Sequence, residues 1–163
     1  YATGFDGVTG PYDRIDIKGK EGRCLKEEWT TFPRTLFGMQ VDGYPNMLMI
    51  LGPHTARGNI PRNIEEVVEW QTDLISFMME NEFDRVEPDS AAVDDWINTV
   101  SKASEGLLSS KIASWQTGVN RNVEGRSAPR VLGYNGGAVR YRKIIDSVAT
   151  REYQEFLFSQ IGK

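Results

Sequence analysis

One stretch near the middle of the chain constrains its fold more than any other. Met47–Leu51 is an unbroken apolar run that ends at Gly52, which is typical of a strand covered on both faces in a parallel sheet. After a loop to Asn59, apolar residues recur near helical spacing as far as Met78, which predicts a long amphipathic helix with one buried face. A strand, a loop and a helix in this order indicate an α/β architecture.

Two helices are predicted in this part of the chain. Asn63 and Glu66 have the spacing of a capping box for the first helix. The second is expected to begin at Asp89 or Ser90, and its apolar pattern continues to Leu108. Its role is packing.

The remaining elements are shorter. Alternation in residues 14–18, turn residues at 19–22 and the apolar end of residues 23–25 predict a hairpin near the start of the chain. Residues 109–137 are rich in Gly, Asn, Ser and Pro and are interpreted as a long loop over a surface, of a length that often binds something. A short helix at Tyr141–Val148 and a closing strand at Tyr153–Phe158 complete the prediction.

Composition narrows the class of protein. The 163 residues contain 39% hydrophobic and 26% charged residues, as in ordinary globular domains. The net charge of −4 has no basic stripe, so we expect no nucleic-acid partner, and no apolar stretch reaches the roughly 18 to 20 residues of a membrane span. A single cysteine, Cys24, favours a reducing, cytoplasmic setting. Because the chain begins at Tyr1 without Met, inside what reads as structured sequence, we expect a fragment of a longer polypeptide.

The loop between the predicted strand and helix is the main candidate site, because ligands in open α/β sheets lie beyond the carboxyl ends of strands. Backbone N–H groups near Asn59 and Ile60 could bind an anionic or carbonyl-bearing ligand at the helix start, although a plain structural turn fits equally well. His54 is the sole histidine, yet no G-x-S-x-G elbow accompanies it. One histidine and one cysteine cannot complete a zinc site, so no metal is expected.

Phosphate-binding loops are missing from the sequence. No Gly-x-Gly-x-x-Gly follows a strand and no Walker motif occurs, and Gly133, Gly136 and Gly137 do not restore one. Trp115, in the long loop, either packs in the core or covers a ligand, and the residue pattern alone favours the core.

A family resemblance rests on several short motifs in a fixed order. The string Ala2–Asp6, which reads Ala-Thr-Gly-Phe-Asp, resembles a fingerprint of the Baeyer–Villiger and flavin-containing monooxygenases, where the chain returns from the NADPH domain to the FAD domain. Further similarity to the Baeyer–Villiger monooxygenases covers nearly the whole chain: Ile17-x-Gly19-x-x-Gly22-x-x-Leu25-x-x-Glu28-Trp29, Gly43-Tyr44-Pro45-Asn46-Met47, Gly52-Pro53, Val68-Glu69-Trp70, Ser114-Trp115-x-x-Gly118-x-Asn120, Gly136-Gly137, Tyr141-Arg142 and Tyr153-x-x-Phe156.

The resemblance implies a fold, a reaction and cofactors. Residues 1–163 would form the C-terminal segment of the FAD-binding domain, with a helical and loop extension, in a flavoprotein that has two Rossmann-like dinucleotide-binding domains. NADPH would reduce bound FAD, O2 would give a flavin C4a-peroxide, and attack on a ketone would yield an ester or lactone.

The resemblance also implies roles for residues. Thr3, Gly4 and Asp6 would contact cofactor, Asn59 and Ile60 would lie beside the pyrimidine edge of the flavin, and Trp115 with Asn120 would approach the nicotinamide nucleotide, which reverses the preference for a core tryptophan. The ketone pocket would be shaped by one loop: Thr55, Ala56, Arg57 and Gly58.

Other parts of the family pattern are absent. The two glycine-rich loops, the Phe-x-Gly-x-x-x-His-x-x-x-Trp signature and the catalytic arginine would all precede Tyr1, so the chain alone is expected to be inactive and colourless. Residues 120–125 are longer than the Asn-x-Pro-Gly form of many small-ring enzymes, which hints at bulkier ketones. Two alternatives stay open: a flavin monooxygenase that oxidises nitrogen or sulfur, and a folded fragment without catalytic function.

Overall fold

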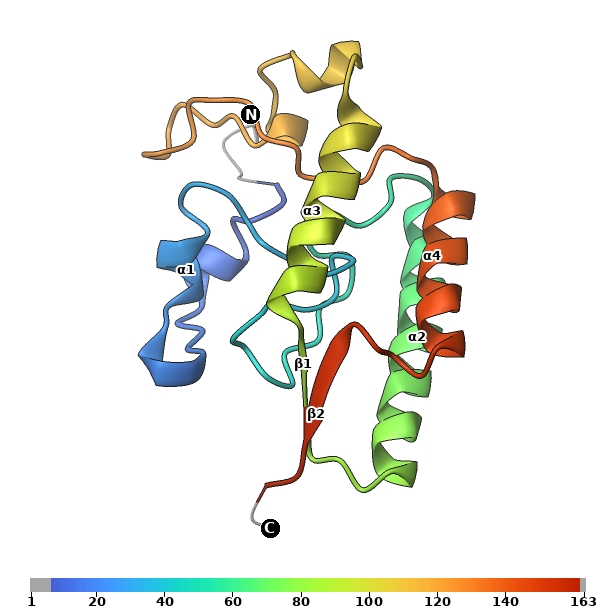
Figure 1. The fold of residues 1–163 in the computed structure, drawn as a ribbon. Coiled ribbons are helices and arrows are strands. Elements are labelled where there is room, and N and C mark those ends of the chain that lie inside the picture. Colours follow the sequence, from blue (N-terminus) through green and yellow to red (C-terminus); the bar gives the residue numbers. More distant parts are fainter. Residues whose placement is uncertain (1–6, 162–163) are drawn as a thin grey trace.

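The computed structural model describes residues 7–161, and its elements follow the chain in a simple order (Figure 1). Helix α1 covers Leu25–Glu28, α2 Ile60–Glu80, α3 Ser90–Ser104 and α4 Ala138–Thr150. The strands are β1, Arg85–Pro88, and β2, Phe156–Ser159. Short 3-10 turns lie between them: η1 Tyr12–Arg14, η2 Lys20–Gly22, η3 Leu108–Ser110 and η4 Trp115–Thr117.

The two long helices begin close to where the sequence predicts. Helix α2 is capped by Asn59, whose side chain accepts a hydrogen bond from the backbone N–H of Arg62 at 3.2 Å. The predicted capping box at Asn63 is therefore wrong, because Asn63 lies inside the helix and is buried. Helix α3 begins after its cap Asp89, as expected, but it ends at Ser104, before Leu108.

The expected buried strand at Met47–Leu51 is absent. The segment is irregular, because Asn46 before it and Leu51 at its end have positive φ, and its backbone bonds include one from Met49 N–H to Met39 C=O at 2.8 Å. Met49 is buried whereas Ile50 is 51% exposed, so the run is divided between core and surface. An apolar run alone does not specify a strand partner, and within residues 7–161 the paired strands are β1 and β2.

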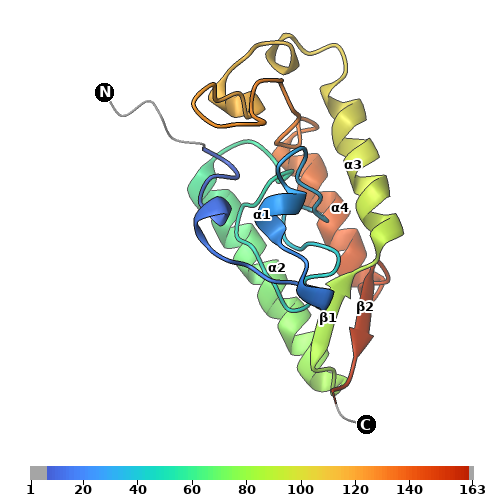
Figure 2. The same ribbon diagram turned by 90° about the vertical axis from the view of Figure 1, so that its left-hand side faces the viewer.

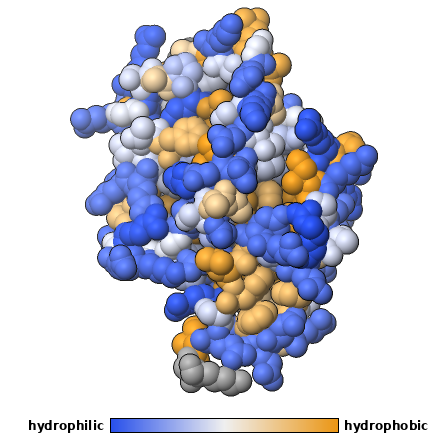
Figure 3. Space-filling model, viewed as in Figure 1, coloured by the Kyte–Doolittle hydropathy of each residue, from blue (hydrophilic) through white to orange (hydrophobic). Residues whose placement is uncertain are grey.

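Strands β1 and β2 form an antiparallel pair in which Arg85 lies opposite Ser159 and Pro88 opposite Phe156. The predicted closing strand is thus confirmed, with its start moved from Tyr153 to Phe156. Figure 3 shows apolar side chains gathered over this pair, in keeping with Leu157, which is 52% exposed. The early hairpin is reduced to a single bridge between Lys18 and Cys24 that is closed by η2, and Leu25 opens a helix instead of a strand.

The helices and the strand pair enclose the main core. Helices α2 and α4 lie side by side in both ribbon views (Figures 1 and 2). Trp96 of α3 reaches Tyr141 of α4, with ring centroids 6.0 Å apart. Trp70 of α2 donates from Nε1 to the C=O of Ile145 in α4 at 2.8 Å and packs against Tyr153 and Phe156. A second, smaller core lies under α1: Leu25, Trp29, Val41, Tyr44 and Met49. None of the helices in residues 7–161 has the length and apolar character that crossing a bilayer requires.

Residues 35–56 are irregular, yet most of them are buried. Gly38, at φ +72°, makes this packing possible, because a Cβ there would lie 2.6 Å from the backbone N of Thr55 and 2.8 Å from the C=O of Pro53. The turn around Gly38 therefore presses directly against the segment that follows the predicted strand.

Candidate functional site

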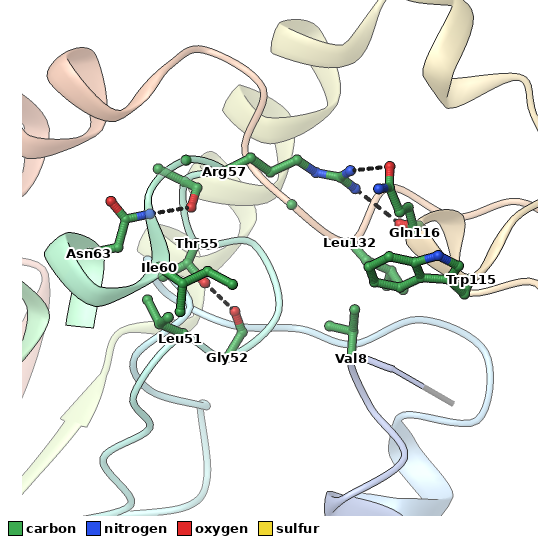
Figure 4. A pocket seen from close by; sticks show the side chains of 13 residues that line it. Val8, Leu51, Gly52, Thr55, Arg57, Ile60, Asn63, Trp115, Gln116 and Leu132 are labelled. Carbon is green, nitrogen blue, oxygen red and sulfur yellow. Dashed lines mark hydrogen bonds between the residues drawn. The ribbon is translucent and has the colours of Figure 1, made fainter. Parts of the chain in front are cut away.

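A pocket of about 320 Å³ lies where the loop before α2 meets the long loop of residues 105–137 (Figure 4). One wall comes from the segment at the start of α2 with residues 132–133, and the other from η4. The lining residues are mostly apolar: Val8, Leu51, Gly52, Thr55, Ala56, Arg57, Gly58, Ile60, Asn63, Trp115, Gln116, Leu132 and Gly133.

The first wall is fixed by backbone hydrogen bonds. Residues 54–57 run beside residues 132–134: the N–H of Tyr134 donates to the C=O of Thr55 at 2.8 Å, and the N–H of His54 donates to the C=O of Leu132 at 3.1 Å. Buried Asn63 adds a side-chain bond, from Nδ2 to the C=O of Ala56 at 3.0 Å. Thr55, Ala56 and Leu132 are themselves buried, so this wall is part of the core.

The second wall is a turn built around Trp115. Ser114 and Thr117 form a capping box across η4, and Gly118 ends the turn at φ +68°. Trp115 is 62% exposed, and in Figure 4 its indole lies across the pocket from Ile60. Arg57 reaches over from the first wall and donates to Gln116 twice: from Nη1 to Oε1 at 3.1 Å and from Nη2 to the backbone C=O at 3.0 Å.

Comparison with known proteins shows which proteins this chain resembles. No family model matches the chain. The cyclohexanone 1,2-monooxygenase of an Acinetobacter species is 37% identical over 155 residues, 95% of this chain and 28% of that protein. The cyclohexanone monooxygenase of Rhodococcus sp. Phi1 bound to NADP+ superposes with a TM-score of 0.91 at 34% identity, over 98% of this chain and 29% of that one. The chain is homologous to one segment of the Baeyer–Villiger monooxygenases.

Two further matches bear on chemistry. The phenazine N-monooxygenase of Lysobacter antibioticus is 36% identical over 157 residues, 96% of this chain and 28% of that protein. The structure of OTEMO with FAD and NADP has a TM-score of 0.82 at 34% identity, over 98% of this chain and 29% of that one. The α/β class with helices packed on strands is confirmed by these structural matches. The chain spans about 28% of the length of its relatives.

The pocket brings together most residues that the resemblance to the Baeyer–Villiger monooxygenases singles out. Thr55, Ala56, Arg57 and Gly58 share one wall with Ile60, and Trp115 forms the wall opposite. Trp115 is exposed, so the first interpretation of it as a core residue is wrong.

Other candidate residues lie elsewhere. Asn59 caps α2 and lines a separate surface groove with Glu66 and Arg142. Asn120 is not among the residues that line the pocket; its Oδ1 accepts from the N–H of Asn122 at 3.1 Å within its own turn. Thr3, Gly4 and Asp6 lie outside the described residues.

His54 is a structural residue. It is fully buried at φ +73° and stacks on Phe32, with ring centroids 5.2 Å apart. Its Nδ1 lies 3.0 Å from Thr35 Oγ1 and its Nε2 lies 3.1 Å from the C=O of Val131. Burial lowers the pKa of His54 to about 4 despite the bond to Val131, so the ring is neutral at pH 7.

Several lining residues were not predicted as site residues from the sequence. Gln116 follows Trp115 directly, and Leu132 and Gly133 lie near the end of the same loop. Their place in the loop that contains the predicted Trp115 is the sequence signal that could have identified them. Asn63 was interpreted as a cap, whereas its side chain points at the pocket loop. Within residues 7–161 no cluster of three His, Cys, Asp or Glu side chains could hold a metal ion.

Proposed function

We propose that the protein containing this chain is an FAD- and NADPH-dependent Baeyer–Villiger monooxygenase, which converts a ketone, O2 and NADPH into an ester or lactone. The observation that carries the proposal is the pocket in which Arg57, Gly58, Ile60 and Trp115 meet. Its mostly apolar lining suits an uncharged ketone. The named relatives include enzymes of cyclohexanone, to which the chain is 37% identical.

The residues at the start of α2 fit the edge of a flavin. Among residues 7–161, the backbone N–H groups of Asn59 and Ile60 have no acceptor, and they lie at the positive end of a 21-residue helix. Donors of this kind suit the electron-rich pyrimidine edge. FAD, when bound, supplies the activation of O2 with electrons from NADPH. Thr3, Gly4 and Asp6 are proposed as further cofactor contacts.

The second wall is proposed to face the nicotinamide nucleotide. Trp115 offers an exposed aromatic face at the pocket, on which a planar ring can stack. Asn120 lies five residues farther along the same loop and would join the contact. On the opposite wall, Thr55, Ala56, Arg57 and Gly58 would shape the space for the ketone. Among the described residues that line this pocket, Arg57 is the only charged one, and it donates a hydrogen bond to Gln116.

We propose that the chain forms the C-terminal segment of the FAD-binding domain with its extension. The glycine-rich loops and the catalytic arginine would then belong to the remainder of the polypeptide. An apolar stripe on α2, facing away from Trp70, offers that remainder a surface to cover: Ile60, Ile64, Val68, Ile75 and Met79 are all more than a third exposed. Alone, the 163 residues should be colourless and inactive. A cytoplasmic location is part of the same proposal.

The test uses the complete protein. Purified enzyme with FAD, NADPH and O2 should convert a cyclic ketone to the lactone, measured by gas chromatography with mass detection alongside NADPH consumption. NADPH consumption with neither lactone nor ester formed, for every ketone tried, would refute the proposal.

Oxidation at nitrogen is the second candidate, because a phenazine N-monooxygenase is 36% identical over 96% of this chain. Parallel assays with a phenazine, a tertiary amine and a sulfide separate the two. Exclusive formation of N-oxide or sulfoxide would favour this candidate over ketone oxidation. If a flavin-loaded protein oxidises neither ketones, nor nitrogen, nor sulfur, a folded segment without catalytic function is favoured.

A further inference from the structure

The two walls of the pocket are held in different ways. Within the long loop, four hydrogen bonds help to hold the Trp115 turn: Thr117 Oγ1 donates to the C=O groups of Ile112 and Ser114, and Arg130 donates through its backbone N–H to Thr117 and through Nη2 to Gly118. The hydrogen bonds that cross the pocket rim from residues 51–60 to this turn both come from Arg57. Residues 59 positions apart in the chain are joined by this one guanidinium group.

We propose that Arg57 and Gln116 form a latch that holds the Trp115 turn over the pocket and thereby limits the size of the ketone that enters. This inference rests on the proposed function for its substrate class. Arg57 then acts as a positioning residue: it holds the Trp115 turn in place, and the turn, not Arg57, contacts the substrate.

The local packing is suited to such a latch. A Cβ on Gly133 would lie 2.7 Å from Nε of Arg57, so the absence of a side chain at Gly133 leaves the path of the guanidinium open. A Cβ on Gly7 would lie 3.0 Å from Cε3 of Trp115, so the indole rests against backbone on its other side. The flat guanidinium matches two acceptors on one residue, which an ammonium group cannot do with the same geometry.

The exposure of the pair allows it to open. Arg57 and Gln116 both reach solvent at the rim, where water competes for the same donors and acceptors. The first wall has no such freedom, because Thr55 and Ala56 are buried and bonded to Tyr134 and Asn63. Opening the latch therefore moves the Trp115 turn and leaves the loop before α2 in place.

Hydrogen exchange in the complete protein tests the tether without reference to activity. In Arg57→Met, which keeps the length of the side chain and removes its donors, peptides covering residues 112–118 should exchange about fivefold faster, as expected for the loss of one exposed hydrogen-bonded contact. Peptides from α2 should be unchanged. Arg62→Met is the matched control, since Arg62 pairs with Glu66 and makes no bond to Gln116. Unchanged exchange at residues 112–118 in Arg57→Met would overturn the latch.

Substrate preference tests the consequence. Arg57→Met should raise kcat/KM for a bulky cyclic ketone relative to cyclohexanone by about fivefold to tenfold, whereas Gln116→Met, which keeps the backbone acceptor, should give a smaller change in the same direction. The double variant should resemble Arg57→Met alone, because both changes break one contact. Arg57→Lys, which keeps one charged donor, should show a smaller rise in this kcat/KM ratio than Arg57→Met.

The outcomes separate the latch from the proposed function. If Arg57→Met impairs only ketones that carry an anionic group and Gln116→Met changes nothing, Arg57 contacts substrate directly and the latch is wrong. Faster exchange at residues 112–118 in an enzyme that oxidises amines instead of ketones would support the latch and overturn the ketone chemistry. Ketone oxidation with additive, independent effects of the two substitutions would support the chemistry and overturn the latch.

Discussion

The two walls of the pocket differ in how the chain supports them. Residues 52–56 of the loop before α2 are buried, and residues 54–57 are hydrogen-bonded to residues 132–134, whereas Trp115 and Gln116 of the turn opposite are exposed and Gln116 is bonded to that loop by Arg57. Substitutions under the first wall should therefore change the stability of the whole fold. Substitutions of the exposed Trp115 and Gln116 in the second should change the shape of the pocket and leave the fold intact.

The same difference sets how precisely each wall can hold a ligand. Backbone bonds within a packed core fix positions closely, while a turn held by exposed side-chain bonds exchanges between arrangements. Under the proposed function, this difference would suit the start of α2 to a cofactor that remains in place and the Trp115 turn to a nucleotide or substrate that enters and leaves.

The largest expected contrast comes from a matched pair of tryptophans. Trp70→Ala removes a buried side chain that bonds to Ile145 and packs against Tyr153, and it should lower the free energy of unfolding by about 3 to 5 kcal/mol. Trp115→Ala should change it by less than about 0.5 kcal/mol, because the side chain is 62% exposed. Urea unfolding of both variants measures the difference. Equal losses would show that the Trp115 turn is part of the core.

A second matched pair uses glycines with positive φ. At Gly38, φ is +72° and a Cβ would meet the backbone of Thr55 at 2.6 Å, so Gly38→Ala should cost about 2 to 5 kcal/mol. At Gly106, φ is +76° and nothing lies within 4 Å of the added Cβ, so Gly106→Ala should cost only about 1 kcal/mol. The midpoints of urea unfolding compare the two. A similar loss of stability at both positions would show that the close contact between Gly38 and Thr55 does not stabilise the first wall.

The three longer helices of the structure are predicted well from the sequence. The period of apolar residues in α2, α3 and α4 and the start signal at Asp89 are local, so they identify helices without knowledge of their partners, although the cap of α2 was predicted at Asn63 and lies at Asn59. Gly, Asn and Pro in residues 109–137 likewise predict the long loop. The order of strand, loop and helix already pointed to a site at the loop that contains Arg57 and at Ile60, whereas Trp115 was expected at a site only from the family resemblance.

The parts that escape prediction depend on distant contacts. Met47–Leu51 has the composition of a buried strand, yet its backbone follows turns that pack on Gly38 and Met39, which the run itself does not encode. The pairing of Arg57 with Gln116 spans 59 residues and requires the path beside Gly133. Asn63 could be placed on a helix from its neighbours, but its bond to the C=O of Ala56 follows only from how the loop folds back.

His54 adds a pH dependence to the first wall. Burial lowers its folded-state pKa to about 4, below the usual value of 6.5, so the unfolded chain binds more protons between these values. The stabilising contribution is complete above pH 6.5 and is lost as the pH falls toward 4, by about 3 kcal/mol. His54→Asn, a residue that tolerates positive φ, should flatten the profile in this window. Urea unfolding at several pH values compares both proteins, and parallel profiles would contradict a buried neutral ring.

The smallest expected effect lies where the first wall meets α2. Asn59→Ala removes the side-chain acceptor for the N–H of Arg62 and should lower the free energy of unfolding by about 1 kcal/mol, whereas Asn59→Ser should retain most of it. Because the cap lies outside the pocket, exchange of residues 112–118 should not change in either variant. A larger loss in Asn59→Ala than in Gly38→Ala would mean that the helix start, and not the close approach of residues 38 and 55, holds the first wall in place.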